Sequence, residues 1–173
     1  MNRRCRVHEG LSMKHVLLTF ALMLASCSGS PTGPTGSQEQ FSWTVGGQSF
    51  AATSNGRGAL RNSSAVSFTG VDCGRSAGVS LYISPAPMSV GTYTVADGRA
   101  YANWTPDGSS GAVAGVHAWD SIGGTGSITI SSISDNWVSG TFNFDLVPFS
   151  NNPDRTRRTL QGSFDMGFRE KIC

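Results

Sequence analysis

The sequence predicts an all-β protein whose exported part folds as one antiparallel β-sandwich of about nine or ten short strands. Apolar and polar residues alternate with a period of two over most of the chain after residue 40, as they do in half-buried strands. No stretch of this part repeats with the period of a helix. Only 14% of the residues are charged and 22 are glycine, a composition typical of exported β-domains. A flattened β-barrel is the alternative, because strand alternation is the same in both architectures.

Residues 1–26 have the pattern of a secretory signal peptide. An apolar segment at residues 16–24 follows Lys14 and ends in small residues. It is too short to cross a bilayer, which takes about 20 apolar residues in a helix. Translation is expected to start at Met13, because the residues before it are unusually rich in arginine for a signal peptide. A precursor peptide that contains those arginines would contradict this start.

Leu-Ala-Ser-Cys at residues 24–27 resembles the lipobox of bacterial lipoproteins. The resemblance implies cleavage between Ser26 and Cys27 and a diacylglyceryl group on the sulfur of Cys27; an ordinary secretory signal cut nearby is the alternative. Two or three acyl chains anchor a protein stably, whereas one anchors it marginally. An aspartate after the cysteine retains such proteins in the inner membrane of some bacteria, and here that residue is Ser28. The resemblance therefore implies the outer membrane, in either leaflet.

The mature chain is predicted to be a tether followed by one domain. Residues 27–40 contain mainly Gly, Ser, Thr and Pro and have no apolar residue after the cysteine, so they cannot contribute to a core. Residues 41–173 are enough for a single core. After processing, the chain contains nine Lys and Arg residues and ten Asp and Glu residues. Because these charges are scattered, nucleic acid is not an expected partner. The expected partners are the membrane, an envelope protein or a glycan.

Cys73 and Cys173 remain as a pair once Cys27 is lipidated. In an oxidising compartment they predict a disulfide, which in the chain-entropy model stabilises by up to about 4 to 5 kcal/mol. Two free thiols are the alternative, because Cys173 is the last residue and chain ends fray. Titration of free thiols in the denatured, unreduced protein distinguishes the two states.

The first strands of the domain are predicted to form a hairpin. Residues 41–45 and 48–52 alternate, and Gly46 and Gly47 between them accept the positive φ angles of a two-residue turn. This register places Trp43 opposite Phe50. Residues 55–61 are expected to be a loop or a weak strand.

The later strands follow the same alternation, and Pro, Asp-Gly and Gly-Gly pairs separate them. Gly123-Gly124 is expected to be one of these turns. On the last strand Leu160, Phe164, Met166 and Phe168 are expected to point inward. The predicted strands are residues 65–69, 78–83, 91–95, 100–104, 112–119, 127–131, 138–146 and 157–168.

Several of these segments together resemble a family of uncharacterised bacterial lipoproteins, filed as a domain of unknown function. The resemblance covers residues 41–168 and implies a secreted, lipid-tethered all-β domain with no catalytic residue. Its motifs are the N-terminal hairpin and residues 91–94, 126–130, 138–144 and 162–164.

The sequence predicts no enzyme, cofactor or metal site. Residues 74–78 match the GxSxG pattern around Ser76, but a nucleophile elbow needs a following helix and a strand is expected here. His117 is the only histidine left after processing, which excludes a histidine-based zinc site within one chain. The second alternative is a hydrolase that uses His117 as its base, oriented by a residue such as Asp120. On a strand, however, His117 and Asp120 are three positions apart and project to opposite faces.

Tyr101, Trp104, His117 and Trp119 are the candidate ligand surface. Tryptophan exposed on a sandwich can stack on sugar rings, and the two tryptophans flank a Gly/Ser-rich loop. A carbohydrate-binding or other small-ligand module is therefore the first alternative. The principal hypothesis is a lipid-anchored cell-envelope β-domain with a non-catalytic binding or structural role.

Residues 154–158 hold the one basic cluster of the mature chain. A solvated hairpin loop is the expected structure, because turn-forming residues precede the cluster. Contact of its arginines with anionic lipid head groups is the alternative.

Overall fold

The computed structural model describes residues 38–106 and 117–168. The predicted signal peptide, the predicted lipidation site Cys27, most of the predicted tether and Cys173 lie outside these residues. So does most of the strand predicted at residues 112–119.

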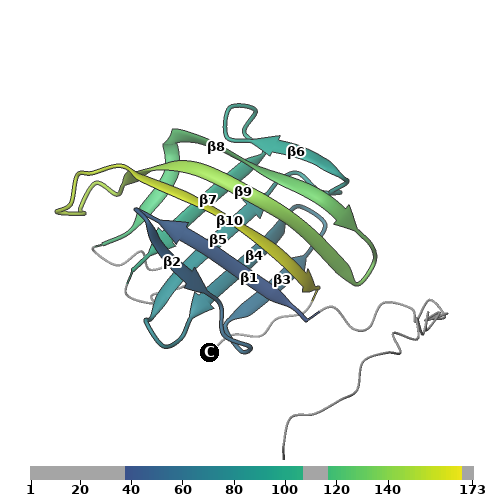
Figure 1. The fold of residues 1–173 in the computed structure, drawn as a ribbon. Coiled ribbons are helices and arrows are strands. Elements are labelled where there is room, and N and C mark those ends of the chain that lie inside the picture. Colours follow the sequence, from purple (N-terminus) through teal and green to yellow (C-terminus); the bar gives the residue numbers. More distant parts are fainter. Residues whose placement is uncertain (1–37, 107–116, 169–173) are drawn as a thin grey trace, which may run out of the picture. The chain divides into compact units, whose positions relative to one another are not determined.

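The described residues form ten strands and no helix, which confirms the all-β prediction (Figure 1). The expected weak strand at residues 55–61 is β3. Nothing in the described ranges forms an apolar helix long enough to span a membrane. The strands are β1 (Gln40–Val45), β2 (Gln48–Ala51), β3 (Arg57–Arg61), β4 (Val66–Asp72), β5 (Ala77–Ile83), β6 (Gly91–Thr94), β7 (Ala100–Thr105), β8 (Trp119–Ile133), β9 (Trp137–Pro148) and β10 (Arg158–Gly167).

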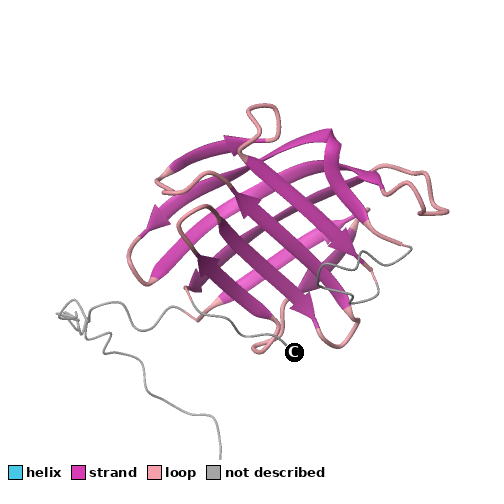
Figure 2. Ribbon diagram, turned by 180° about the vertical axis from the view of Figure 1, so that it is seen from behind, coloured by secondary structure: helices cyan, strands magenta, loops and turns pink. Residues whose placement is uncertain are grey.

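One antiparallel sheet contains all ten strands, in the order β2-β1-β10-β9-β8-β7-β5-β4-β3, with β6 paired to β8. The sheet curls into a half-barrel, and Figures 1 and 2 show its two ends folded over each other. We call β2, β1, β10, β9, β6 and the later part of β8 the front layer. The back layer consists of β3, β4, β5, β7 and the first residues of β8. The core lies between the two layers, as in a sandwich or flattened barrel.

Strand β8 belongs to both layers because it bends. On one side, its first residues pair with β7 and its later residues pair with β6. On the other side, both parts pair with β9. The register against β9 shifts between Asp120 and Thr125, where Gly123 has a φ of 77°. The turn predicted at Gly123-Gly124 is therefore wrong. The glycines form a bulge within one strand, because a bulge uses the same positive φ angles as a turn.

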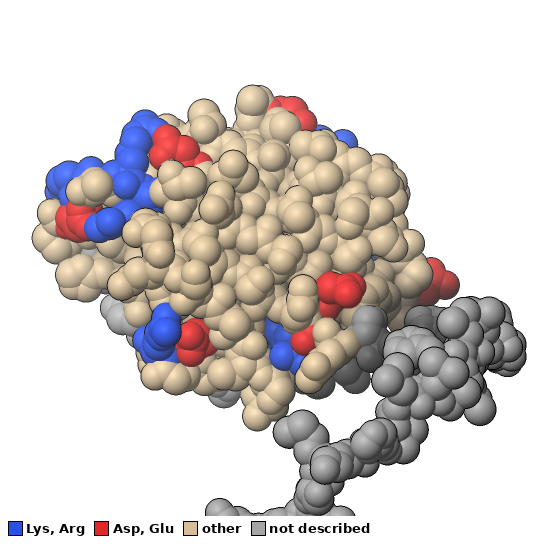
Figure 3. Space-filling view, in the orientation of Figure 1, with Lys and Arg blue, Asp and Glu red and all other residues tan. Residues whose placement is uncertain are grey.

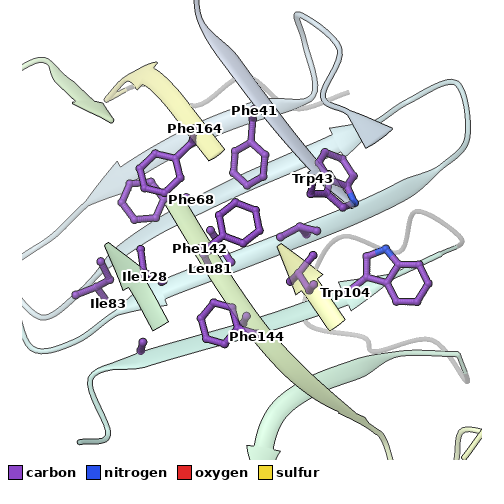
Figure 4. Close-up of a cluster of buried hydrophobic side chains, with 14 of the residues drawn as sticks. Phe41, Trp43, Phe68, Leu81, Ile83, Trp104, Ile128, Phe142, Phe144 and Phe164 are labelled. Carbon is purple, nitrogen blue, oxygen red and sulfur yellow. The ribbon is translucent and has the colours of Figure 1, made fainter. Parts of the chain in front are cut away.

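Aromatic rings from both layers fill the core (Figure 4). Phe164 of the front layer stacks on Phe68 of the back layer, with 4.5 Å between ring centroids. The predicted pairing of Trp43 with Phe50 is confirmed, with centroids 5.5 Å apart and planes 10° from parallel. Several rings lie where a glycine leaves space: a Cβ added to Gly140 would lie 2.7 Å from Cζ of Phe164.

The folded part begins earlier than the predicted tether allows. Gln40 already lies in β1, opposite Asp165. The side chain of Glu39 is only 7% exposed and forms an ion pair with Arg57 at 3.3 Å. Its other carboxylate oxygen accepts a hydrogen bond from the amide of Gly167 at 3.4 Å. Glu39 was assigned to the tether because it is polar, but its charge is paired in the fold.

Candidate functional site

The two tryptophans of the predicted ligand surface belong to the core. Trp104 and Trp119 are only 7% and 4% exposed, and their ring centroids lie 4.9 Å apart on adjacent strands. The indole nitrogen of Trp119 donates a hydrogen bond to the carbonyl oxygen of Thr156 at 2.9 Å. The expectation that these rings are exposed for stacking is therefore wrong. They are buried because the other face of β7 carries the more polar Tyr101.

Tyr101 projects from the outer face of the back layer. It lies opposite Tyr82 on β5, with ring centroids 5.8 Å apart, and Tyr82 is 38% exposed. His117 is exposed and precedes β8. Trp104 and Tyr101 thus occupy opposite faces of β7, so the four predicted residues do not form one surface.

The described residues do not form the hydrolase arrangement either. Asp120 is buried, and its Oδ1 accepts a hydrogen bond from the amide of Ile122 at 2.9 Å. In this part of the chain no hydrogen bond joins Asp120 to His117. Ser76 has a φ of 56° but lies in the turn between two strands, β4 and β5. No group of three or more metal-ligating side chains occurs within residues 38–106 and 117–168.

Cys73 lies in the same β4–β5 turn. The hydroxyl of Thr53 donates a hydrogen bond to its Sγ at 2.9 Å. Because Cys173 lies outside the described residues, the Cys73–Cys173 disulfide stays a prediction.

The environment of Tyr101 changes its acidity. Burial, and next the charge of Asp120, raise the pKa of Tyr101 from 10.0 to about 12. Burial also raises the pKa of Asp120, against a smaller opposite effect of the hydrogen bond from Ile122. Both shifts follow from partial removal of a charged group from water.

Tyr101 is therefore expected to ionise later than an exposed tyrosine. Because the folded state favours the neutral phenol, this group stabilises the fold fully below pH 10.0 and loses that effect as the pH rises towards about 12. Phenolate absorbance during an alkaline titration measures the pKa. Asp120→Asn removes the neighbouring charge and is expected to lower it. If the phenolate titration step at the highest pH remained in a Tyr101→Phe variant, that step could not belong to Tyr101.

The outer face of the front layer carries uncharged polar side chains in rows that cross six strands. Neighbours in each row are register partners, and some hydroxyls bond to each other, such as Thr92 and Thr129 at 3.0 Å. Figure 3 shows that charged atoms lie around the rim of this face and not at its centre. The first row is Ser49, Thr44, Gln161, Asn143, Ser127 and Thr94. The second row begins with the apolar Ala51 and continues with the polar residues Ser42, Ser163, Thr141, Thr129 and Thr92.

A groove of about 450 Å³ lies on this face, over β2, β1, β10 and β9. We call it the front groove. Its polar lining consists of Ser42, Thr44, Ser49, Asn143 and Gln161. The other lining residues are Trp43, Phe50, Phe142 and Gly162. We take the front groove as the candidate binding site of the described residues.

Sequence reasoning missed the front groove. The signal of its residues in the sequence is Ser, Thr, Asn and Gln at alternate positions with no charge among them. That signal becomes a site only when strands distant in sequence become neighbours.

Comparison with known proteins finds no relative of this chain: no protein-family model matches it, and no curated protein or solved structure is significantly similar to it. The resemblance to a lipoprotein family stays a prediction.

Proposed function

We propose that this chain is a cell-envelope protein, lipid-anchored to the bacterial outer membrane through Cys27, whose β-domain binds a glycan without catalysis. The observation that carries the binding role is the front groove, where five uncharged polar side chains line about 450 Å³. The observation that carries the anchor is the lipobox-like sequence that ends at Cys27.

A glycan fits the chemistry of the front groove. Sugar hydroxyls both donate and accept hydrogen bonds, and so do the hydroxyls of Ser42 and Thr44 and the amides of Asn143 and Gln161. Because no charged side chain lines this groove, a neutral ligand segment leaves no buried charge unpaired. Its volume lies within the range of typical ligand sites, about 300–1,000 Å³.

Binding is expected to depend on the two amides. Asn143 and Gln161 are register partners on adjacent strands and are exposed, so the double change Asn143→Ala and Gln161→Ala removes polar groups without disturbing the core. Each lost neutral hydrogen bond weakens binding by about 0.5–1.5 kcal/mol, so the double variant is expected to bind about tenfold more weakly. Titration calorimetry of the full-length protein in detergent, with oligosaccharides that a glycan array selects, measures the change.

Thr92→Ala is the matched control, because Thr92 lies on the same face but outside the groove lining. Equal affinities of the double variant and the wild type would exclude the front groove as the site. A glycan array without any bound sugar would reject the glycan function.

The outer face of the back layer is a second candidate. Tyr82 and Tyr101 form an aromatic pair there, and Asn103 projects from the same face of β7. Tyrosine rings stack on sugar faces. If this face were the site, Tyr82→Ala would abolish binding and the amide double variant would not.

The anchor is tested separately. Cys27→Ser removes the acceptor of the diacylglyceryl group, so the protein is expected to move from the membrane fraction to the soluble fraction after cell disruption, because no acyl chains then hold it. Immunoblotting of the two fractions measures this. Ser28→Ala, which leaves the cysteine in place, is expected to stay with the membrane. A Cys27→Ser protein that remains in the membrane fraction would contradict lipidation at this residue.

A further inference from the structure

A second groove continues the front groove towards one end of the domain. It measures about 430 Å³ and shares Thr44 and Gln161 with the front groove. Its remaining walls are the Gly46-Gly47 turn and Arg157, Arg158 and Thr159. We call it the arginine groove. One ligand can therefore lie across both grooves.

Basic groups gather beside the arginine groove. Figure 3 shows them at the end where the loop between β9 and β10 projects in Figure 1. Arg155, Arg157 and Arg158 lie there with two carboxylates, those of Asp145 and Asp154. The cluster therefore has one positive charge more than it has negative charges.

The ion pairs and one further hydrogen bond still leave guanidinium donors unused. Nη1 of Arg157 contacts Asp145, and Nη2 of Arg158 contacts Asp154, each at 2.6 Å. Arg157 also donates a hydrogen bond from Nη2 to the carbonyl oxygen of Gly123 at 3.5 Å. A guanidinium has five N–H donors. Nη1 of Arg158 lies beside the wall of the groove, 3.4 Å from the position of a Cβ added to Gly46. Arginine donors in this arrangement bind anionic oxygen atoms well.

The arginine groove lies far from the point where the chain enters the domain. The chain enters the domain at the start of β1, where Gln40 pairs with Asp165. The arginine groove lies at the other end of β10, next to Arg158. At about 3.3 Å per residue, the strand from Asp165 to Arg158 spans roughly 23 Å.

We infer that the ligand is an acidic glycan, whose sugar hydroxyls lie in the front groove and whose carboxylate or other anionic group binds Arg157 and Arg158 in the arginine groove. This inference rests on the proposed glycan-binding function. It names the ligand class: an oligosaccharide that carries a negative charge on a sugar unit.

A matched pair of probes tests the inference. An oligogalacturonate and its methyl-esterified form have the same sugar units, but only the first is charged. At low salt the full-length protein in detergent is expected to bind the acid about tenfold more tightly, because hydrogen bonds to a charged group are stronger than neutral ones. This preference is expected to shrink as salt screens the charges.

Arg157→Gln and Arg158→Gln, singly and together, are expected to weaken binding of the acid more than binding of the ester, and so to remove the preference for the acid. Arg157→Gln is the safer variant for folding, because the Arg157 side chain is 55% exposed. Arg61→Gln is the control: it removes one surface charge from β3, where Arg61 stacks on Phe168 and lies outside both grooves.

The outcomes separate the two proposals. Equal affinity of the wild type for acid and ester would overturn the acidic-glycan inference and leave the glycan-binding function standing. Binding of neither probe, nor of any other charged or neutral glycan, would reject both. If the arginine variants instead lose binding to phosphatidylglycerol vesicles while acid and ester bind equally, the cluster serves lipid head groups and the inference is wrong.

Discussion

Replacing Gly126 with alanine is expected to destabilise the domain by more than about 3 kcal/mol. Gly126 has a φ of 146°, which side chains rarely adopt. A Cβ at this position would lie 2.4 Å from Cδ1 of Phe144 and 2.5 Å from the carbonyl oxygen of Asn143. Neither group can move away, because both belong to the paired strand β9. The substitution therefore opposes the pairing of β8 with β9 next to the bulge.

Urea unfolding of the Gly126→Ala protein measures this effect. Gly74→Ala is the control, because Gly74 lies in the β4–β5 turn and its added Cβ would only touch the Asp72 side chain, at 3.4 Å. The control is expected to change the free energy of unfolding by less than about 1 kcal/mol. An equally small change for Gly126→Ala would mean that the pairing of β8 with β9 does not need glycine at this position.

Replacing Phe164 with alanine is expected to lower the free energy of unfolding by about 3–5 kcal/mol. Its ring is fully buried, stacks on Phe68 of the opposite layer and lies over Gly140. Removing it opens a cavity at the centre of the core, bordered by the rings of Phe41 and Phe142. The strands of both layers are held in place by their own backbone hydrogen bonds, so they cannot move together enough to close the cavity fully.

Thermal and urea denaturation compare Phe164→Ala with Leu60→Ala. Leu60 is 47% exposed on the edge strand β3, so its loss is expected to change stability by less than about 1 kcal/mol. Similar losses for the two variants would show that the contact between the layers at Phe164 does not determine stability.

Local patterns were enough to predict the all-β class and most of the strands. The Gly46-Gly47 turn sets the register of the first hairpin, and so Trp43 was correctly placed opposite Phe50. The buried residues of β9 and β10, such as Phe144 and Leu160, were recognisable because one face of each strand is apolar throughout. These features depend on residues that are close in sequence.

Two errors arose where a local pattern has two structural solutions. A Gly-Gly pair suits both a turn and a bulge, and at Gly123 only the pairing of β8 with β9 over its whole length selects the bulge. Strand β7 carries aromatic residues on both faces. Tyr101 and Trp104 were predicted to share one surface, although strand residues three positions apart point to opposite faces, and packing decides which of the two is buried.

By itself, the sequence determined the alternation of each strand, the turn chemistry and the lipoprotein-like N-terminus, because these are properties of neighbouring residues. Only the tertiary structure decided the order of the strands and, with it, the two grooves. Thr44 comes from β1, which is far in sequence from the consecutive strands β9 and β10 that carry Asn143 and Gln161. They become neighbours because the curled sheet inserts β10 between β1 and β9, which buries the apolar faces of all three strands in one core.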